Sequence, residues 1–259
     1  MTLSEIQRAS SDNLRQTYFR LAMSIPDTVL VEDPAYRACL GEFEHPICNF
    51  AADLKLDPWS GRRLANLAMS RRSFNVYALP GDEPAHVAEL LIRCDFRISY
   101  RLIQMASDGA PVEPSIDMRK AESAPIRSEI AQFMTDQFFP RQTSGFRRRI
   151  AQATADSQVL DLYEMIWGDQ RIGGVMLYET ELAVGIYNLC IDFPRRGQGL
   201  GRLLTNWALR QASLRTKPAI LQCDPHLQEW YEKQGFCRTG TIDVYTLSNP
   251  VRRDIMGIT

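Results

Sequence analysis

Arg196-Gly197-Gln198-Gly199-Leu200-Gly201 lies between an apolar run and a helix-like stretch, and no other passage of the chain is as informative. Upstream, residues 182–191 have the pattern of a buried strand, and downstream apolar residues from Leu203 on recur at helical spacing. A glycine-rich turn between a strand and a helix exposes several backbone N–H groups at the positive end of the helix dipole. The passage therefore predicts a site for a phosphate or a pyrophosphate, with a plain tight connection as the alternative.

Two common phosphate-binding loops do not fit this passage. A Walker loop would end in Gly-Lys-Ser/Thr, and the dinucleotide-binding fingerprint has a different glycine spacing. What remains is Arg-x-x-Gly-x-Gly. A second passage follows at residues 219–224, which read as a strand, and continues through His226 to Tyr231-x-x-x-Gly235-Phe236.

Together the two passages resemble the GNAT acetyltransferase superfamily, in which the glycine-loop amides hold the pyrophosphate of acetyl-coenzyme A. The family usually has Asn and Ala where this chain has Asp224 and Leu227. The resemblance implies that the backbone of the preceding strand end pairs with the pantetheine arm. Asp224 is expected either to serve the cofactor region or to cap the helix that begins near His226, and an Asp before a helix favours the cap. The cofactor-binding residues implied are Leu189, Cys190, Ile191, Arg196, Gly197, Gln198, Gly199, Leu200, Gly201, Arg202 and Asp224.

The resemblance also implies which residues carry the chemistry. Tyr231 is the candidate general acid for the leaving thiolate, because a phenol can give up its proton where charge forms in a dry cleft; the alternative is a core tyrosine with a locally bonded hydroxyl. Many family members carry a Glu as general base on the strand before the loop, but the aligned residue here is Gly185. Neither Tyr187 nor the nearby acidic residues Glu179, Glu181 and Asp192 has a spacing that favours it as the base.

Composition limits the class of protein. The 259 residues suggest one or two domains with a substantial core, and the net charge of −1 argues against a general nucleic-acid binder. No apolar run is long enough to span a membrane and no signal peptide is recognised. Six scattered cysteines without a CxxC pair indicate reduced, mostly buried thiols and a cytoplasmic location, and with three histidines they give no support to a metal site.

A repeat is visible in the sequence. Residues 61–96 align without a gap with residues 201–236, and Gly61-Arg62-x-Leu64-x-Asn66-x-Ala68 matches Gly201-Arg202-x-Leu204-x-Asn206-x-Ala208. We interpret this as a duplication. The first copy has Leu56-Asp57-Pro58-Trp59-Ser60 in place of the glycine loop, and Leu91 in place of Tyr231. Pro58 lacks a donor and Asp57 would repel a phosphate, so the first copy is expected not to bind the cofactor.

These patterns predict the fold. The Pro- and Gly-rich residues 106–115 mark a boundary. The predicted division is a degenerate GNAT-like domain at 1–111 and an acetyl-CoA-binding GNAT domain at 112–259. Strand and helix signals in the second domain follow the order strand, two helices, three strands, helix, strand, helix, strand. The fold class is therefore α/β (α+β), a duplicated GNAT fold with a mixed, mostly antiparallel sheet and flanking helices.

The functional expectation is an acetyl-CoA-dependent N-acyltransferase that acts on a primary amine of a small molecule, an amino acid or a peptide. The alternative is a non-catalytic acyl-CoA-binding sensor or scaffold, suggested by the glycine at the base position. An unrelated phosphate-binding α/β protein is the third reading. No metal, nucleic acid or membrane is expected as a partner, and both a monomer and a homodimer are consistent with a duplicated chain.

Overall fold

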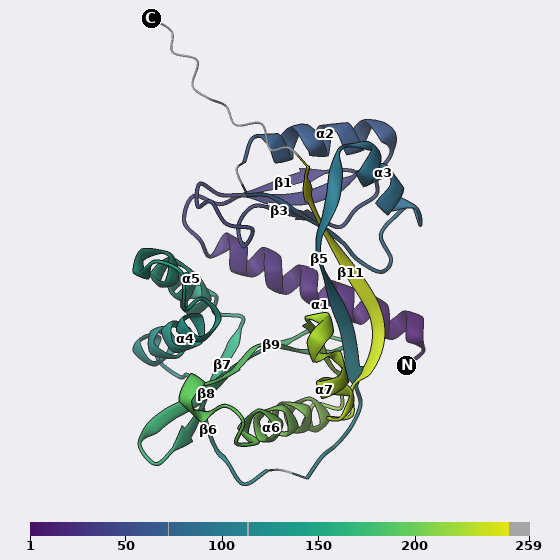
Figure 1. The fold of residues 1–259 in the computed structure, drawn as a ribbon. Coiled ribbons are helices and arrows are strands. Elements are labelled where there is room, and N and C mark those ends of the chain that lie inside the picture. The colour runs from purple at the N-terminus through teal and green to yellow at the C-terminus, as the bar shows by residue number, and fades with distance from the viewer. Residues whose placement is uncertain (72, 113, 249–259) are drawn as a thin grey trace, which may run out of the picture. The chain divides into compact units, whose positions relative to one another are not determined.

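The computed structural model describes residues 1–71, 73–112 and 114–248 (Figure 1). The helices are α1 (Leu3–Met23), α2 (Pro58–Met69), α3 (Val87–Arg93), α4 (Ala124–Phe138), α5 (Ser144–Asp156), α6 (Leu200–Leu214) and α7 (Gln228–Glu232), with 3-10 turns η1 (Phe193–Arg195) and η2 (Pro225–Leu227). The strands are β1 (Val29–Asp33), β2 (Tyr36–Leu40), β3 (Phe50–Ala52), β4 (Asn75–Ala78), β5 (Phe96–Ser107), β6 (Asp117–Lys120), β7 (Asp161–Trp167), β8 (Gln170–Glu179), β9 (Val184–Ile191), β10 (Ala219–Cys223) and β11 (Cys237–Leu247). Within the described ranges no helix combines the length and the apolar character needed to cross a membrane.

The chain divides into two compact units. Unit 1 comprises Met1–Ile25 and Ile103–Gly240, and unit 2 comprises Pro26–Leu102 and the described residues from Thr241 on. The long strands β5 and β11 each contribute one segment to each unit. These units differ from the predicted division at 111/112, because α1 belongs with the C-terminal half of the sequence. The boundary at 111/112 was predicted as the point where the first sequence copy ends and the second begins, and in that sense it stays a prediction.

Unit 1 follows the element order predicted for the second copy, from β6 through α4, α5, β7, β8, β9, α6, β10 and α7 to β11. Neighbouring strands from β6 to β9 are antiparallel, β9 and β10 are parallel, and β10 pairs antiparallel with β5. Local signals explain the element ends. Gly168 takes a positive φ in the β7–β8 turn, and the side chain of Thr2 accepts a hydrogen bond from the Glu5 amide at the start of α1.

Helices cover both faces of the unit 1 sheet. Alternate residues of a strand point to opposite faces. On β10, Leu221 lies in the same core cluster as Leu204 of α6, whereas Ile220 packs with Ala9 of α1. Figure 1 shows α6 on one side of the sheet and α1, α4 and α5 on the other. The functional features described below are placed relative to these two faces.

Unit 2 repeats the strand pattern of unit 1. The strands β1, β2 and β3 are antiparallel neighbours and β3 pairs in parallel with β4, as β7, β8, β9 and β10 do. Helix α2 follows β3 as α6 follows β9, so the predicted duplication is confirmed in the order and pairing of elements. The final strands are exchanged: β10 pairs with β5, and β4 pairs with β11. Tyr245 of β11 is accordingly 1% exposed in the core of unit 2.

Candidate active site

The glycine loop leads from the end of β9 through η1 to α6. Gly197 and Gly199 have φ angles of 80° and 79°, and Gly199 is the N-cap of α6. Nothing lies within 4 Å of a Cβ placed on either glycine. The requirement for glycine at these positions is therefore the left-handed backbone and not a lack of space.

The loop presents backbone donors that lack partners. Among the described residues, no acceptor is found for the amides of Gly197, Gln198, Gly199, Leu200 and Gly201. The first intrahelical bonds are those of Arg202 and Leu203, whose amides donate to the Gly199 carbonyl at 3.1 and 3.3 Å. Free amides at the positive end of a fifteen-residue helix form an anion site. This geometry fits the diphosphate of a coenzyme A molecule.

The charged and polar side chains of the loop have different roles. The Arg196 Nε donates to the carbonyl oxygen of Ile191 at 3.1 Å, and its guanidinium lies over the ring of Phe193 at 5.3 Å. Arg196 therefore fixes the strand end to the loop. Gln198 lies close to the Pro194 carbonyl, whereas Arg202 is exposed and can turn towards a bound anion.

Strands β9 and β10 separate beyond the first residues of their pairing. They pair only at Val184 with Ala219 and at Gly185 with Ile220 within the described chain. The β8–β9 register shifts between Gly174 and Met176, and Asn188 on β9 has a φ of 49°, so a bulge interrupts the strand. The backbone edge of residues 189–191 that faces away from β8 is thus left without a strand partner. The expected pantetheine-binding residues Leu189, Cys190 and Ile191 lie along this opening.

Tyr231 lies on α7, close to the end of β10. Its half-buried ring packs edge-on against Trp230 and Phe236, at centroid distances of 4.8 and 5.6 Å. Burial, with a smaller contribution from the Cys223 thiol, raises the pKa of Tyr231 to about 12. No hydrogen bond of its hydroxyl is found among the described residues. The hydroxyl is therefore protonated at neutral pH and free to donate.

Asp224 caps the turn that follows β10. Its carboxylate accepts the His226 amide at 3.2 Å and lies 2.5 Å from Nδ1 of the same histidine. These hydrogen bonds lower the pKa of Asp224, the side-chain bond to His226 most of all. Asp224 thus performs the capping role expected from the sequence. Any contact of Asp224 with a cofactor stays a prediction.

Gly185 faces α1, and the space in front of it is filled. A Cβ on Gly185 would overlap Asn13 Oδ1 and Tyr187 Cε2. The Tyr187 hydroxyl donates to Asn13 Oδ1 at 2.7 Å, and Asn13 Nδ2 donates to the Tyr178 carbonyl at 3.0 Å. Sequence reasoning found Gly185 but not Asn13, because α1 lies far away along the chain and has no motif. The one available signal was the polar spacing within an otherwise helical N-terminal segment.

Residues 159–238 match the family model described as acetyltransferase (GNAT) domain. This segment is a GNAT domain.

A comparison with curated protein sequences gave no match. Among solved structures, a GCN5-related N-acetyltransferase from Kribbella flavida has a TM-score of 0.63 at 16% identity, covering 92% of this chain and 94% of that one. A tandem GNAT protein from the clavulanic acid biosynthesis pathway has a TM-score of 0.61 at 14% identity, covering 87% and 86%. A functionally unknown conserved protein from Staphylococcus epidermidis ATCC 12228 has a TM-score of 0.62 at 15% identity, covering 85% and 94%. The likenesses to the two GNAT proteins show the GNAT fold over most of the chain.

Two of the acidic residues near Gly185 in the sequence, Glu179 and Asp192, are engaged elsewhere. Glu179 forms ion pairs with Arg215 at 3.1 Å and with Lys217 at 2.6 Å, and both partners lower its pKa. Asp192 accepts a hydrogen bond from Gln137 at 3.3 Å. The described residues contain no group of three or more His, Cys, Asp or Glu side chains placed to hold a metal ion.

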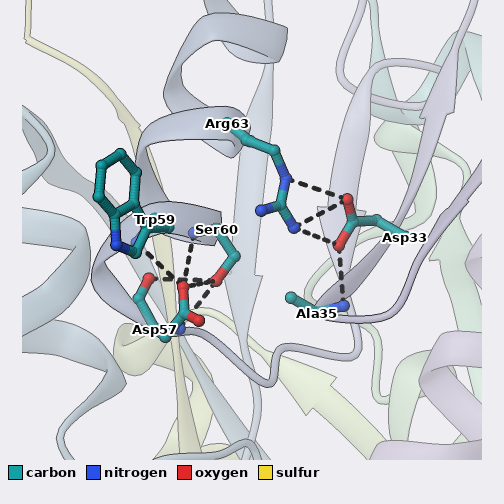
Figure 2. Close-up of polar contacts among 6 residues, drawn as sticks. All are labelled: Asp33, Ala35, Asp57, Trp59, Ser60 and Arg63. Carbon is teal, nitrogen blue, oxygen red and sulfur yellow. Dashed lines mark hydrogen bonds and ion pairs between the residues drawn. The ribbon is translucent and has the colours of Figure 1, made fainter.

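The first GNAT-like copy has a closed helix end in place of the anion site (Figure 2). The Asp57 carboxylate accepts the amides of Trp59 and Ser60 at 2.9 and 2.7 Å, and the Ser60 hydroxyl accepts the Asp57 amide at 2.8 Å. Pro58 occupies the first turn of α2 and offers no donor. The carboxylate stands where a bound anion would lie. The prediction that this copy lacks the anion site agrees with its geometry.

Proposed function

We propose that the GNAT domain is an acetyl-CoA-dependent N-acyltransferase that acts on a primary amine of a small molecule, an amino acid or a peptide. The observation that carries the proposal is the row of unpartnered amides at residues 197–201, which lies beside the opening between β9 and β10. An anion cradle next to a splayed pair of parallel strands fits a ligand that has a diphosphate and an extended amide-containing arm.

Each residue has a defined task in this proposal. Acetyl-CoA supplies the acetyl group as a thioester. The loop amides hold its diphosphate, with Arg202 at the helix start, and the free edge of residues 189–191 pairs with the arm. A backbone amide of that edge can polarise the thioester carbonyl. The Tyr231 hydroxyl donates its proton to the sulfur as the carbon–sulfur bond breaks, and solvent restores that proton.

The first test is thermal unfolding at increasing concentrations of acetyl-CoA. A ligand present at ~100 times its Kd adds about 2.7 kcal/mol to the stability of the folded state. We expect this stabilisation in the native chain and not in Gly199→Glu, where a carboxylate enters the cradle. Gly81→Glu is the matched control, since Gly81 also has a positive φ and open space but lies in unit 2. Stabilisation absent from the native chain, or retained in Gly199→Glu, would refute the assigned site.

A non-catalytic acyl-CoA sensor is the second candidate, and the filled space in front of Gly185 is the observation that favours it. Acetyl transfer to a panel of amines, followed by mass spectrometry, separates the two. An acetylated product that requires an intact Gly199 excludes the sensor. Binding of acetyl-CoA without any product would favour it over the transferase.

A further inference from the structure

The face of the β9–β10 opening that α1 covers is polar but uncharged. Gly185 and Tyr187 of β9 contact Asn13 of α1. On β10 and β5, Gln222 and Gln104 are directly opposite in the antiparallel ladder, so both side chains project from the same face. The hydrogen bond from Gln104 Nε2 to the Ser11 hydroxyl, 3.3 Å long, shows that this face is the one under α1.

Three buried polar atoms here have no hydrogen-bond partner among the described residues. They are the Ser10 hydroxyl oxygen, Gln104 Oε1 and Gln222 Nε2. Ser10 and Gln104 are 0% exposed. Buried polar atoms are nearly always hydrogen-bonded in folded proteins. Gln222 is half-buried and therefore stands at the accessible edge of this face. Its free Nε2 donor and the free Oε1 acceptor of Gln104 opposite it match the small polar groups of a ligand, including the N–H of an uncharged amine.

Among the described residues, the titratable groups of α1, β8, β9 and β10 give no general base on this face. Burial raises the pKa of Tyr187 far above neutral pH, and the Tyr178 hydroxyl donates to Gln16 at 2.9 Å. The carboxylates on α1 and β8 are engaged in ion pairs or caps. These are Glu5 with the Thr2 amide, Asp12 with Arg15, and Glu179 with Arg215 and Lys217. Three further titratable side chains on α1 and these strands do not serve as a base here. Tyr18 of α1 interacts electrostatically with Tyr187, and Cys223 of β10 lies in the core on the α6 side of the sheet. Burial raises the pKa of Cys190 on β9 to about 12. An exposed imidazole and carboxylate, those of His226 and Asp224, lie together at the end of β10.

We propose that the acceptor amine enters this face as the uncharged base, and that the domain therefore selects α-amino groups over the ε-amino groups of lysine. This inference rests on the proposed transferase function. Moving an ammonium ion onto a water-poor face without a carboxylate is costly, whereas a neutral amine loses little and gains a hydrogen bond. The nitrogen lone pair then forms the bond to the acetyl carbon and the carbon–sulfur bond breaks. The surplus proton on nitrogen passes to solvent, and the sulfur receives one from Tyr231.

The expected selectivity follows from the pKa values of the two amines. With about 7.7–8.0 for an α-amino group and about 10.4 for lysine, the uncharged fractions at pH 7 differ by about 200- to 400-fold. We expect kcat/KM to differ by a similar factor at pH 7. The difference should shrink as the pH rises above 8, because the α-amino group is then already uncharged.

The experiment uses the full chain, acetyl-CoA and two peptides of one sequence. In the first peptide the α-amine is free and the lysine is dimethylated; in the second the α-amine is acetylated and the lysine is free. kcat/KM is measured from about pH 5.5 to 9.5. For the peptide with the free α-amine, we expect kcat/KM to level off near the pKa of that amine. For the peptide with the free lysine, we expect kcat/KM to rise over the whole pH range. If kcat/KM rises over the same pH range for both peptides, a group of the protein and not the amine controls the rate. That result would overturn the inference and leave the transferase function intact. Loss of the shared rise in His226→Gln would then identify His226 as the base.

A variant tests whether the selectivity arises on this face. Gln222→Glu places a carboxylate there, which stabilises an ammonium and accepts its proton. We expect the preference for the α-amine at pH 7 to fall by at least tenfold, with the thermal midpoint recorded to exclude unfolding. An unchanged preference in the folded variant would overturn the assignment. No product from either peptide, in protein that acetyl-CoA stabilises, would overturn the transferase function and the inference together.

Discussion

The Tyr187 hydroxyl donates a hydrogen bond of 2.7 Å to Asn13 Oδ1, which joins β9 to a helix 174 residues earlier in the sequence. Asn13 is 0% exposed and also bonds the Tyr178 carbonyl. Through these contacts α1 covers the sheet face in front of Gly185. An N-terminal segment thus forms part of the unit that carries the glycine loop, and it excludes a larger side chain from position 185.

We expect Gly185→Ala to destabilise the chain by about 1–3 kcal/mol, because the added methyl group overlaps both Asn13 and Tyr187. Chemical denaturation measures the change. Gly145→Ala is the control: nothing lies within 4 Å of a Cβ there, and alanine suits α5 at least as well. In the double variant with Asn13→Ala the two effects should not add, since both residues share one space. Strict additivity would contradict this close contact.

We expect Tyr231→Phe to lower kcat by about 10²-fold or more, with a small change in the affinity for acetyl-CoA. The phenol pKa of about 12 keeps Tyr231 protonated across the working range. Native kcat should therefore show no loss from Tyr231 ionisation below about pH 11. Steady-state kinetics from pH 6 to 10 provides the measurement. Turnover that Tyr231→Phe leaves intact across this range would remove Tyr231 from the mechanism.

Short-range patterns in the sequence predicted much of unit 1. The glycine loop, the flanking strand and helix, and the hairpin around Gly168 are local features with their own turn and capping signals. The exchanged pairings of β5 with β10 and of β4 with β11 could not be predicted this way, because both copies have similar strand patterns. The contact of Asn13 with Gly185 is also non-local. The sequence showed a glycine where many relatives carry the base, but not that α1 fills the space in front of it.

We expect Asp57→Asn to lower the thermal midpoint at neutral pH without creating acetyl-CoA binding in unit 2. The amide of Ser60, its hydroxyl and then the Trp59 amide lower the pKa of Asp57 in the folded state. Because the pKa of Asp57 is lower in the folded state, its ionised form stabilises the fold at any pH above the unfolded-state pKa of about 3.9. This stabilisation is lost as the pH falls through the folded-state pKa. The gap between native and variant midpoints should therefore close towards pH 3. A gap of constant size would show that the charge of Asp57 contributes nothing.

We expect Arg127→Met to cost about 3 kcal/mol of stability. The buried guanidinium donates to the carbonyls of Ala155, Ser157 and Leu160 at 2.9–3.0 Å, which fixes the end of α5 to α4. Each such bond contributes about 1 kcal/mol, and the carbonyls lose their donor in the variant. Denaturant titration against Arg148→Met, an exposed position on α5, provides the comparison. Equal stabilities of the two variants would refute the structural role of Arg127.

The exchanged strands predict that neither half of the sequence folds alone. A fragment of residues 112–259 lacks α1 and β5, so Ile220 loses its cover and β10 loses its antiparallel partner. A fragment of residues 1–111 lacks Tyr245 of β11 and leaves a cavity in its core. We expect each fragment alone to show no cooperative thermal transition, and the two expressed together to form a soluble complex that acetyl-CoA stabilises. A cooperative transition in the isolated 112–259 fragment would show that the predicted boundary at 111/112 separates independent domains.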